Sequence, residues 1–167
     1  MPRTGQLAVS ASRRIVLAAL LALLATAAGL LGPAASPGQA AARCYGDGCN
    51  AQDPQAMGCA SDARVLAEFT YRSVRVKLNH SPACGAAWTK FENPLGGQPG
   101  QQFALLAVWD RQQGGSLITI MSVRVQTDTT AWLAGYTHMW TFSRFVQACL
   151  SNSSSSLTRQ DLCTARY

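Results

Sequence analysis

Side chains that commonly perform acid–base catalysis are scarce in this sequence. It has only two histidines, His80 and His138, and only two glutamates, Glu68 and Glu92. Glycoside hydrolases need two carboxyl groups facing one bond, and no such pair is visible here. The G-x-S-x-G turn that exposes the nucleophile of an α/β-hydrolase is also absent. The sequence therefore assembles no recognisable catalytic set.

Clustered charge is lacking as well. The chain has 14 Lys and Arg against eight Asp and Glu, a formal net charge of +6. Arg3, Arg13 and Arg14 belong to the N-terminal leader described next, so the remainder has 11 basic and eight acidic residues, a net charge of +3. Its basic residues are scattered singly, unlike the dense patch of a nucleic-acid-binding protein. We expect no nucleic-acid partner.

The first 42 residues have the three parts of a secretory signal peptide. A positive start is followed by an apolar run at residues 15–31 and by an A-x-A cleavage site at residues 40–42. We predict cleavage after Ala42, with Ala40 as the alternative. The product would be a secreted, extracellular protein without membrane contact. An uncleaved anchor is the competing interpretation, but 17 apolar residues are near the lower limit for crossing a bilayer.

The leader is compatible with two export routes. Ser12-Arg13-Arg14 resembles the start of a twin-arginine signal, whose route carries folded proteins. The strongly apolar run is typical of the general secretory (Sec) route. We favour the Sec route because it fits a chain whose disulfides form after export. Lipid anchoring is disfavoured, since Arg43 rather than a small residue precedes the first cysteine.

All six cysteines lie behind this leader: Cys44, Cys49, Cys59, Cys84, Cys149 and Cys163. An even number in a short exported domain predicts a disulfide framework. The sequence does not select one connectivity, and our preferred pairing is 44–49, 59–84 and 149–163. The competing use is metal binding by thiolates. Because paired C-x-x-C motifs are absent and the compartment is oxidising, we expect no metal and no cofactor.

The rest of the chain has the pattern of short β-strands. Residues 65–71 and 74–78 alternate in polarity around Arg72-Ser73, which predicts a hairpin that ends in a turn at residues 80–82. Residues 141–150 fit either a strand or a short helix. Further strands are expected at residues 84–91, 103–109 and 117–125, while residues 132–136 are left unassigned.

These elements predict one all-β domain with at most one short helix. Short strands at this spacing favour a small disulfide-stapled β-sandwich or barrel. Residues 43–62 would form a Cys-rich loop segment, and residues 63–167 the β-rich body of the same domain.

Several spaced motifs resemble a known family. They are Cys44-Tyr45-Gly46-Asp47-Gly48-Cys49, Asp53-Pro54, Gly58-Cys59-Ala60-Ser61-Asp62-Ala63 and Ser81-Pro82-Ala83-Cys84-Gly85-Ala86-Ala87-Trp88. The pattern is similar to that of small secreted Cys-rich domains of unknown function from high-GC Gram-positive bacteria, and it extends to about Cys149. The resemblance implies a secreted, disulfide-bonded domain and no particular reaction. His80 and His138 stand where that family pattern has an aromatic residue and a proline, which weakens any catalytic scheme based on them.

Three aspartates near the N-terminus form the first candidate site. Asp47, Asp53 and Asp62 could offer oxygen ligands to calcium. Their spacing does not match an EF-hand loop. Aspartates in such loops more often fix turns by accepting hydrogen bonds from backbone N–H groups, and this is the role we expect.

The function we expect is binding rather than catalysis. Trp88 and Trp109 are the candidate binding residues, because exposed tryptophans can line a groove, although burial in the core is the commoner use. The partner would be a cell-envelope polymer or an extracellular protein. The alternative is a small secreted hydrolase or toxin that uses His80 and His138 as acid and base. A third alternative is an inhibitor with an exposed loop at residues 93–102.

Overall fold

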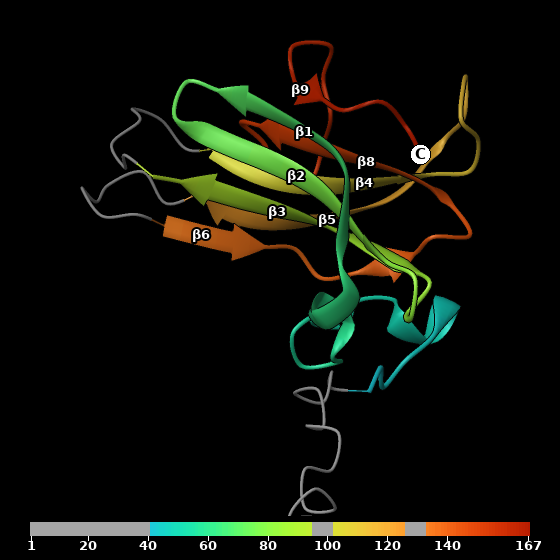
Figure 1. Cartoon of the computed structure of the whole chain (residues 1–167). Coiled ribbons are helices and arrows are strands. Elements are labelled where there is room, and N and C mark those ends of the chain that lie inside the picture. Colours follow the sequence, from blue (N-terminus) through green and yellow to red (C-terminus); the bar gives the residue numbers. More distant parts are fainter. Residues whose placement is uncertain (1–40, 95–101, 126–132) are drawn as a thin grey trace, which may run out of the picture. The chain divides into compact units, whose positions relative to one another are not determined.

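The computed structural model describes residues 41–94, 102–125 and 133–167, so residues 1–40 of the predicted signal peptide lie outside this part. The strands form two antiparallel sheets, one in the order β1-β2-β3-β6, with β7 also pairing to β3, and one in the order β5-β4-β8-β9 (Figure 1). The strands are β1 (Arg64–Tyr71), β2 (Val74–Ser81), β3 (Ala86–Asn93), β4 (Gln102–Trp109), β5 (Leu117–Val125), β6 (Leu133–Tyr136), β7 (Trp140–Thr141), β8 (Phe145–Ser151) and β9 (Leu162–Cys163). The predicted all-β class is confirmed.

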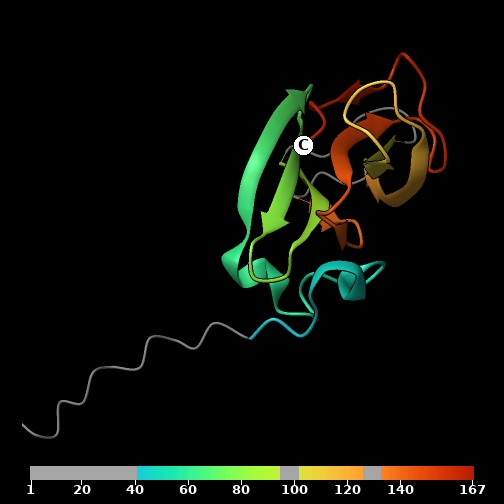
Figure 2. The same cartoon turned by 90° about the vertical axis from the view of Figure 1, so that its right-hand side faces the viewer.

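One apolar core fills the space between the two sheets, which are seen as two layers in Figure 2. Alternate residues of a strand point to opposite faces of its sheet. Val74, Val76 and Leu78 of β2 therefore face the core together, and each is fully buried. The buried residues that meet them from the other strands are Ala87, Phe91, Ala104, Leu106, Val108, Val125, Val146, Ala148 and Leu150.

Each sheet also has part of its outer face covered by one end of the described chain. The Cys-rich segment covers β3 around Trp88, which packs with Met139 and three buried cysteines. The C-terminal segment covers β4 around Leu105 and Ala107, where Leu157 packs beside Cys149. Two small satellite cores therefore flank the main one.

Two local expectations are corrected, and one open alternative is decided. Residues 43–62 are not all loop, since they contain the 3₁₀ helices η2 (Gly46–Cys49) and η3 (Cys59–Asp62). The turn expected at residues 80–82 begins later, because His80 and Ser81 still pair with β3. Residues 145–151 are strand β8 rather than helix, because they pair with β4 along their whole length.

Within the described residues, no helix has the length and apolar character needed to cross a bilayer.

The core leaves no room for a methyl group at Gly135. A Cβ there would lie 2.5 Å from Cε1 of Phe91, which is 3% exposed and held between the sheets. We predict that Gly135→Ala lowers the free energy of unfolding by about 1–3 kcal/mol, the usual cost of overpacking. Gly48→Ala is the matched control, because a Cβ there meets no atom within 4 Å. Urea denaturation measures both, and equal stability of the two variants would contradict the packing described.

Candidate functional site

Three disulfides join the six cysteines: Cys44–Cys49, Cys59–Cys84 and Cys149–Cys163. These are the pairs preferred from the sequence. The third bridge links β8 to β9, where its cysteines face each other in the ladder. The first two lie side by side, with Sγ of Cys44 only 3.8 Å from Sγ of Cys59 in the other bridge.

Hydrogen bonds from aspartates fix the Cys-rich segment. Asp53 Oδ1 accepts hydrogen bonds from the backbone N–H groups of Gln55 and Ala56, at 2.8 and 2.9 Å. The hydroxyl of Tyr136 donates to Asp53 Oδ2 at 3.3 Å. Burial, and then the nearby carboxylate of Asp53, raise the pKa of Tyr136. Asp53 thus connects the segment to β6.

Asp62 plays a similar part at the turn after β2. Its carboxylate accepts hydrogen bonds from the hydroxyl of Ser81 and from the backbone N–H of Ala83, the latter at 2.8 Å. Across the described ranges, the aspartates form no group of three or more candidate metal ligands. The geometry gives Asp53 and Asp62 the turn-fixing role expected from the sequence.

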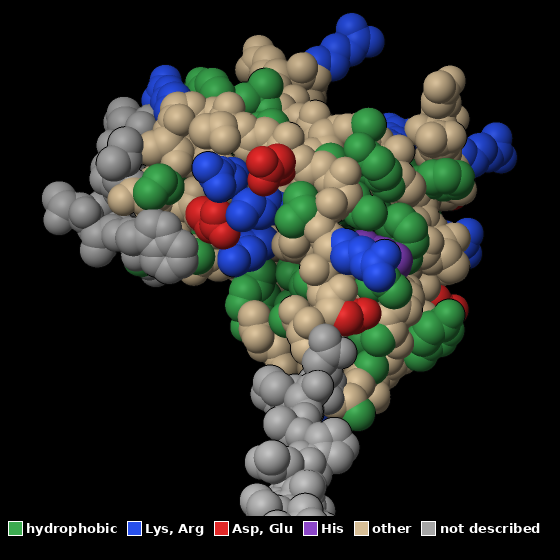
Figure 3. All heavy atoms as spheres, viewed as in Figure 1, with side chains coloured by type: hydrophobic (Ala, Val, Ile, Leu, Met, Phe, Trp, Pro, Cys, Tyr) green, Lys and Arg blue, Asp and Glu red, His purple; other side chains and the backbone are tan. Residues whose placement is uncertain are grey.

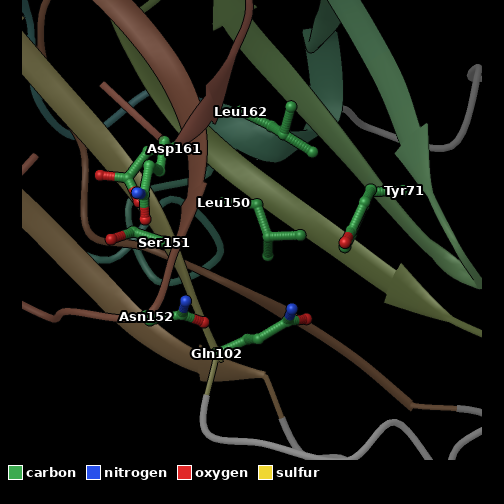
Figure 4. Close-up of a pocket in the computed structure, with 8 residues that line it drawn as sticks. Tyr71, Gln102, Leu150, Ser151, Asn152, Asp161 and Leu162 are labelled. Carbon is green, nitrogen blue, oxygen red and sulfur yellow. The ribbon is translucent and has the colours of Figure 1, made fainter. Parts of the chain in front are cut away.

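A polar cleft lies at one edge of the sandwich, where strand ends from both sheets meet (Figure 4). Tyr71 ends β1, Gln102 begins β4 and Leu150 lies near the end of β8. Figure 4 shows these three side chains pointing into the same space, with Asn152 and Asp161 on the other side. The cavity has a volume of about 190 Å³.

The cleft presents polar groups that the fold leaves available. Oε1 of Gln102 is buried and accepts no hydrogen bond within the part of the chain that the structure describes. Asp161 Oδ2 already accepts a hydrogen bond from the backbone N–H of Thr158, at 2.6 Å. A buried acceptor without a partner costs about 1–3 kcal/mol, so Gln102 favours a ligand or water that donates to it.

A larger and more apolar cavity, of about 440 Å³, lies beside the Cys-rich segment. Tyr45, His80 and Phe142 line it, and the His80 and Phe142 ring centroids are 4.2 Å apart. Burial lowers the pKa of His80, the charge of Asp62 opposes this shift, and the charge of Arg64 adds to it. A hydrophobic wall with a histidine that favours its neutral form is suited to packing more than to proton transfer.

The two histidines of the hydrolase alternative lie on different sides of β3. His80 is on β2, opposite Ala87 of β3. His138 is exposed in the connection between β6 and β7, both of which pair with the other edge of β3. His138 is not among the residues that line the His80 cavity. The structure therefore does not assemble the acid–base pair that this alternative needs.

The candidate tryptophans are placed differently from the expectation. Trp88 is 3% exposed under the Cys-rich segment, which corrects its proposed role as an exposed binding residue. Trp109 is half-buried, and the guanidinium carbon of Arg166 lies 3.4 Å from its ring centroid. The C-terminal segment thus covers one face of the Trp109 ring. Trp132 and most of the loop at residues 93–102 lie outside the described residues.

Basic and acidic side chains are interleaved on the outer face of the first sheet (Figure 3). The carboxylate of Glu92 contacts Lys77 at 2.9 Å, Lys90 at 3.1 Å and Arg75 at 3.9 Å. Partial burial alone would raise the pKa of Glu92, but hydrogen bonds from the two lysines outweigh it and lower the pKa. One carboxylate therefore faces three cationic side chains, so this cluster keeps a net positive charge.

Sequence reasoning missed the residues of the polar cleft. Tyr71 and Gln102 are ordinary polar residues at strand ends with no motif around them, and Asn152 stands out only as the start of the sequon Asn152-Ser153-Ser154. They meet only because β4 and β8 pair in the second sheet while β1 lies in the first. To find these residues from the sequence, one would need to know the order of the strands in the two sheets.

We predict that His80 makes stability depend on pH near neutrality. The folded state holds the pKa of His80 below its ordinary value of 6.5, so the unfolded chain takes up the proton first as pH falls. The free energy of unfolding is therefore highest above pH 6.5, where His80 is neutral in both states. It falls as the pH drops toward the pKa of His80 in the folded state. His80→Gln should flatten the fall in unfolding free energy between about pH 7.5 and pH 5.5. His138→Gln, at an exposed position, is the control. Urea melts that give His80→Gln the same pH slope as the unaltered chain would contradict this.

Comparison with known proteins identifies a family. A family model described as a protein of unknown function (DUF2690) matches residues 47–155. No curated protein and no solved structure matches the chain. The match includes all the strands except β9, together with the bridge between Cys59 and Cys84. The chain is therefore a member of the DUF2690 family, a domain of unknown function that is here all-β and disulfide-bonded.

Proposed function

We propose that the protein is a secreted, non-enzymatic domain that binds a neutral, hydroxyl-rich polymer of the cell envelope in the polar cleft. The observation that carries this proposal is the polar lining of the cleft, to which Gln102, Asn152 and Tyr71 contribute from strand ends of both sheets. The three disulfides support a site of action in an oxidising compartment.

The chemistry of the cleft favours a polyol. Side-chain amides such as those of Gln102 and Asn152 can donate and accept hydrogen bonds, as hydroxyl groups do. Tyr71 adds an aromatic ring at the edge of the cleft, against which the apolar face of a sugar can pack. The carboxylate of Asp161 disfavours an anionic group inside the cleft.

The size of the cleft favours one unit of a polymer over a whole free ligand. Its volume of about 190 Å³ is below the roughly 300–1,000 Å³ of sites that enclose drug-sized molecules. A chain that enters with one residue and continues along the surface fits this limit. Binding to repeated units would also compensate for weak affinity at each one.

A sedimentation assay with insoluble cell-wall glycan tests the proposal. We expect the protein to be retained, and Gln102→Ala and Asn152→Ala to weaken retention by about three- to tenfold each, the effect of losing one hydrogen bond. Gln113→Ala, in the exposed connection between β4 and β5, is the matched control. Thermal melts of each variant report whether the fold is intact. Absence of retention, or retention that neither cleft substitution changes, would overturn the proposal.

A further inference from the structure

Four of the six cysteines form one compact cluster. The sulfur atoms of Cys44, Cys49, Cys59 and Cys84 all lie within 4.8 Å of one another. Three of these cysteines have no exposed surface, and Cys44 is half-buried. The cluster is closed by η2, by η3 and by the turn that leads into β3. Cys149 and Cys163 are not part of it, and no second group of this kind is present in the described ranges.

One separation among these sulfurs matches that of a zinc site. Four thiolates bound tetrahedrally at about 2.3 Å from Zn²⁺ lie about 3.8 Å from one another. The unbonded pair, Cys44 and Cys59, already has this separation of 3.8 Å. The two bonded pairs are disulfides in this structure, so their sulfurs can take up this spacing only after both bridges are reduced.

We propose that the reduced chain binds one Zn²⁺ through Cys44, Cys49, Cys59 and Cys84, in place of the two disulfides. A dithiol reductant opens each bridge by delivering two electrons and two protons, and is itself oxidised to a disulfide. The four thiols formed then lose four protons to solvent as their thiolates bind the ion. A disulfide oxidant reverses the sequence: it takes two electrons from each thiolate pair, is itself reduced to a dithiol with two protons from solvent, and Zn²⁺ is released.

Zinc binding would keep the domain folded in a reducing compartment, where its disulfides cannot persist. In the oxidised protein the two bridges hold the Cys-rich segment over Trp88 and Met139. A tetrathiolate site would connect the same three stretches of chain and cover the same side chains. The same four cysteines thus hold the segment either through two disulfides or through one zinc ion. The redox potential of the compartment selects between the two forms.

Cobalt titration of the full chain, reduced with a phosphine under anaerobic conditions, tests this proposal. We expect thiolate-to-cobalt charge-transfer absorption and the d–d bands of a tetrahedral site to saturate at one Co²⁺ per chain, and one equivalent of Zn²⁺ to abolish them. The β-sheet circular dichroism of the reduced chain should reach that of the oxidised protein as the metal binds.

Two variants separate the cluster from nonspecific binding by thiols. Cys84→Ser should lower the affinity for Zn²⁺ by roughly a hundredfold, because it removes one of four ligands. The double variant Cys149→Ser, Cys163→Ser loses two thiols outside the cluster and should bind one Zn²⁺ unchanged. Lack of a tetrahedral spectrum, equal affinity in the two variants, or binding without recovery of the β-sheet signal would each overturn the proposal.

Discussion

The bridge Cys59–Cys84 ties a segment with little apolar surface of its own to the turn that leads into β3, and the bridge Cys44–Cys49 closes a loop within that segment. Apart from its cysteines, this segment contributes little more than Met57 and Ala60 to the packing around Trp88. Hydrophobic burial alone would secure it poorly. Each bridge typically adds ~2–4 kcal/mol, a large share of the ~5–15 kcal/mol of a whole domain. The order of this end of the structure therefore depends on covalent links.

The same constraint limits where a partner can bind. The Cys-rich segment covers one end of the first sheet, and the C-terminal segment, tied by Cys149–Cys163, covers part of the second. The charged face around Glu92 is occupied by its own ion pairs. The described surface offers the polar cleft at the edge of the sandwich, which Gln102 lines, and the more apolar cavity beside the Cys-rich segment, which His80 lines.

Much of the fold could be predicted from the sequence because its signals are local. Alternation in residues 74–78 and the Arg72-Ser73 turn define the first hairpin, and the structure pairs β1 with β2 around this turn. The disulfide pairing that we prefer from the sequence is also the pairing in the structure. At residues 145–151 the local pattern was ambiguous. Pairing with β4, a partner distant in sequence, decides in favour of a strand.

The candidate site could not be predicted in the same way. Trp88 looks like a binding residue in isolation, but its exposure depends on whether a separate segment covers it. His80 and His138 have the chemistry of an acid–base pair, yet β3 runs between their strands. In both cases the deciding information is the relation between elements far apart in the chain. Local residue chemistry supplies candidates, and the strand order selects among them.

Peptide mapping of the exported protein without reduction tests the covalent clamp most directly. A protease that cuts before aspartate separates all six cysteines, because Asp47, Asp53, Asp62, Asp110 and Asp161 lie between them. Mass spectrometry should find peptides linked as Cys44–Cys49, Cys59–Cys84 and Cys149–Cys163, with an N-terminus at Arg43. A Cys44–Cys59 link, or a free thiol at any of the first four cysteines, would contradict the account.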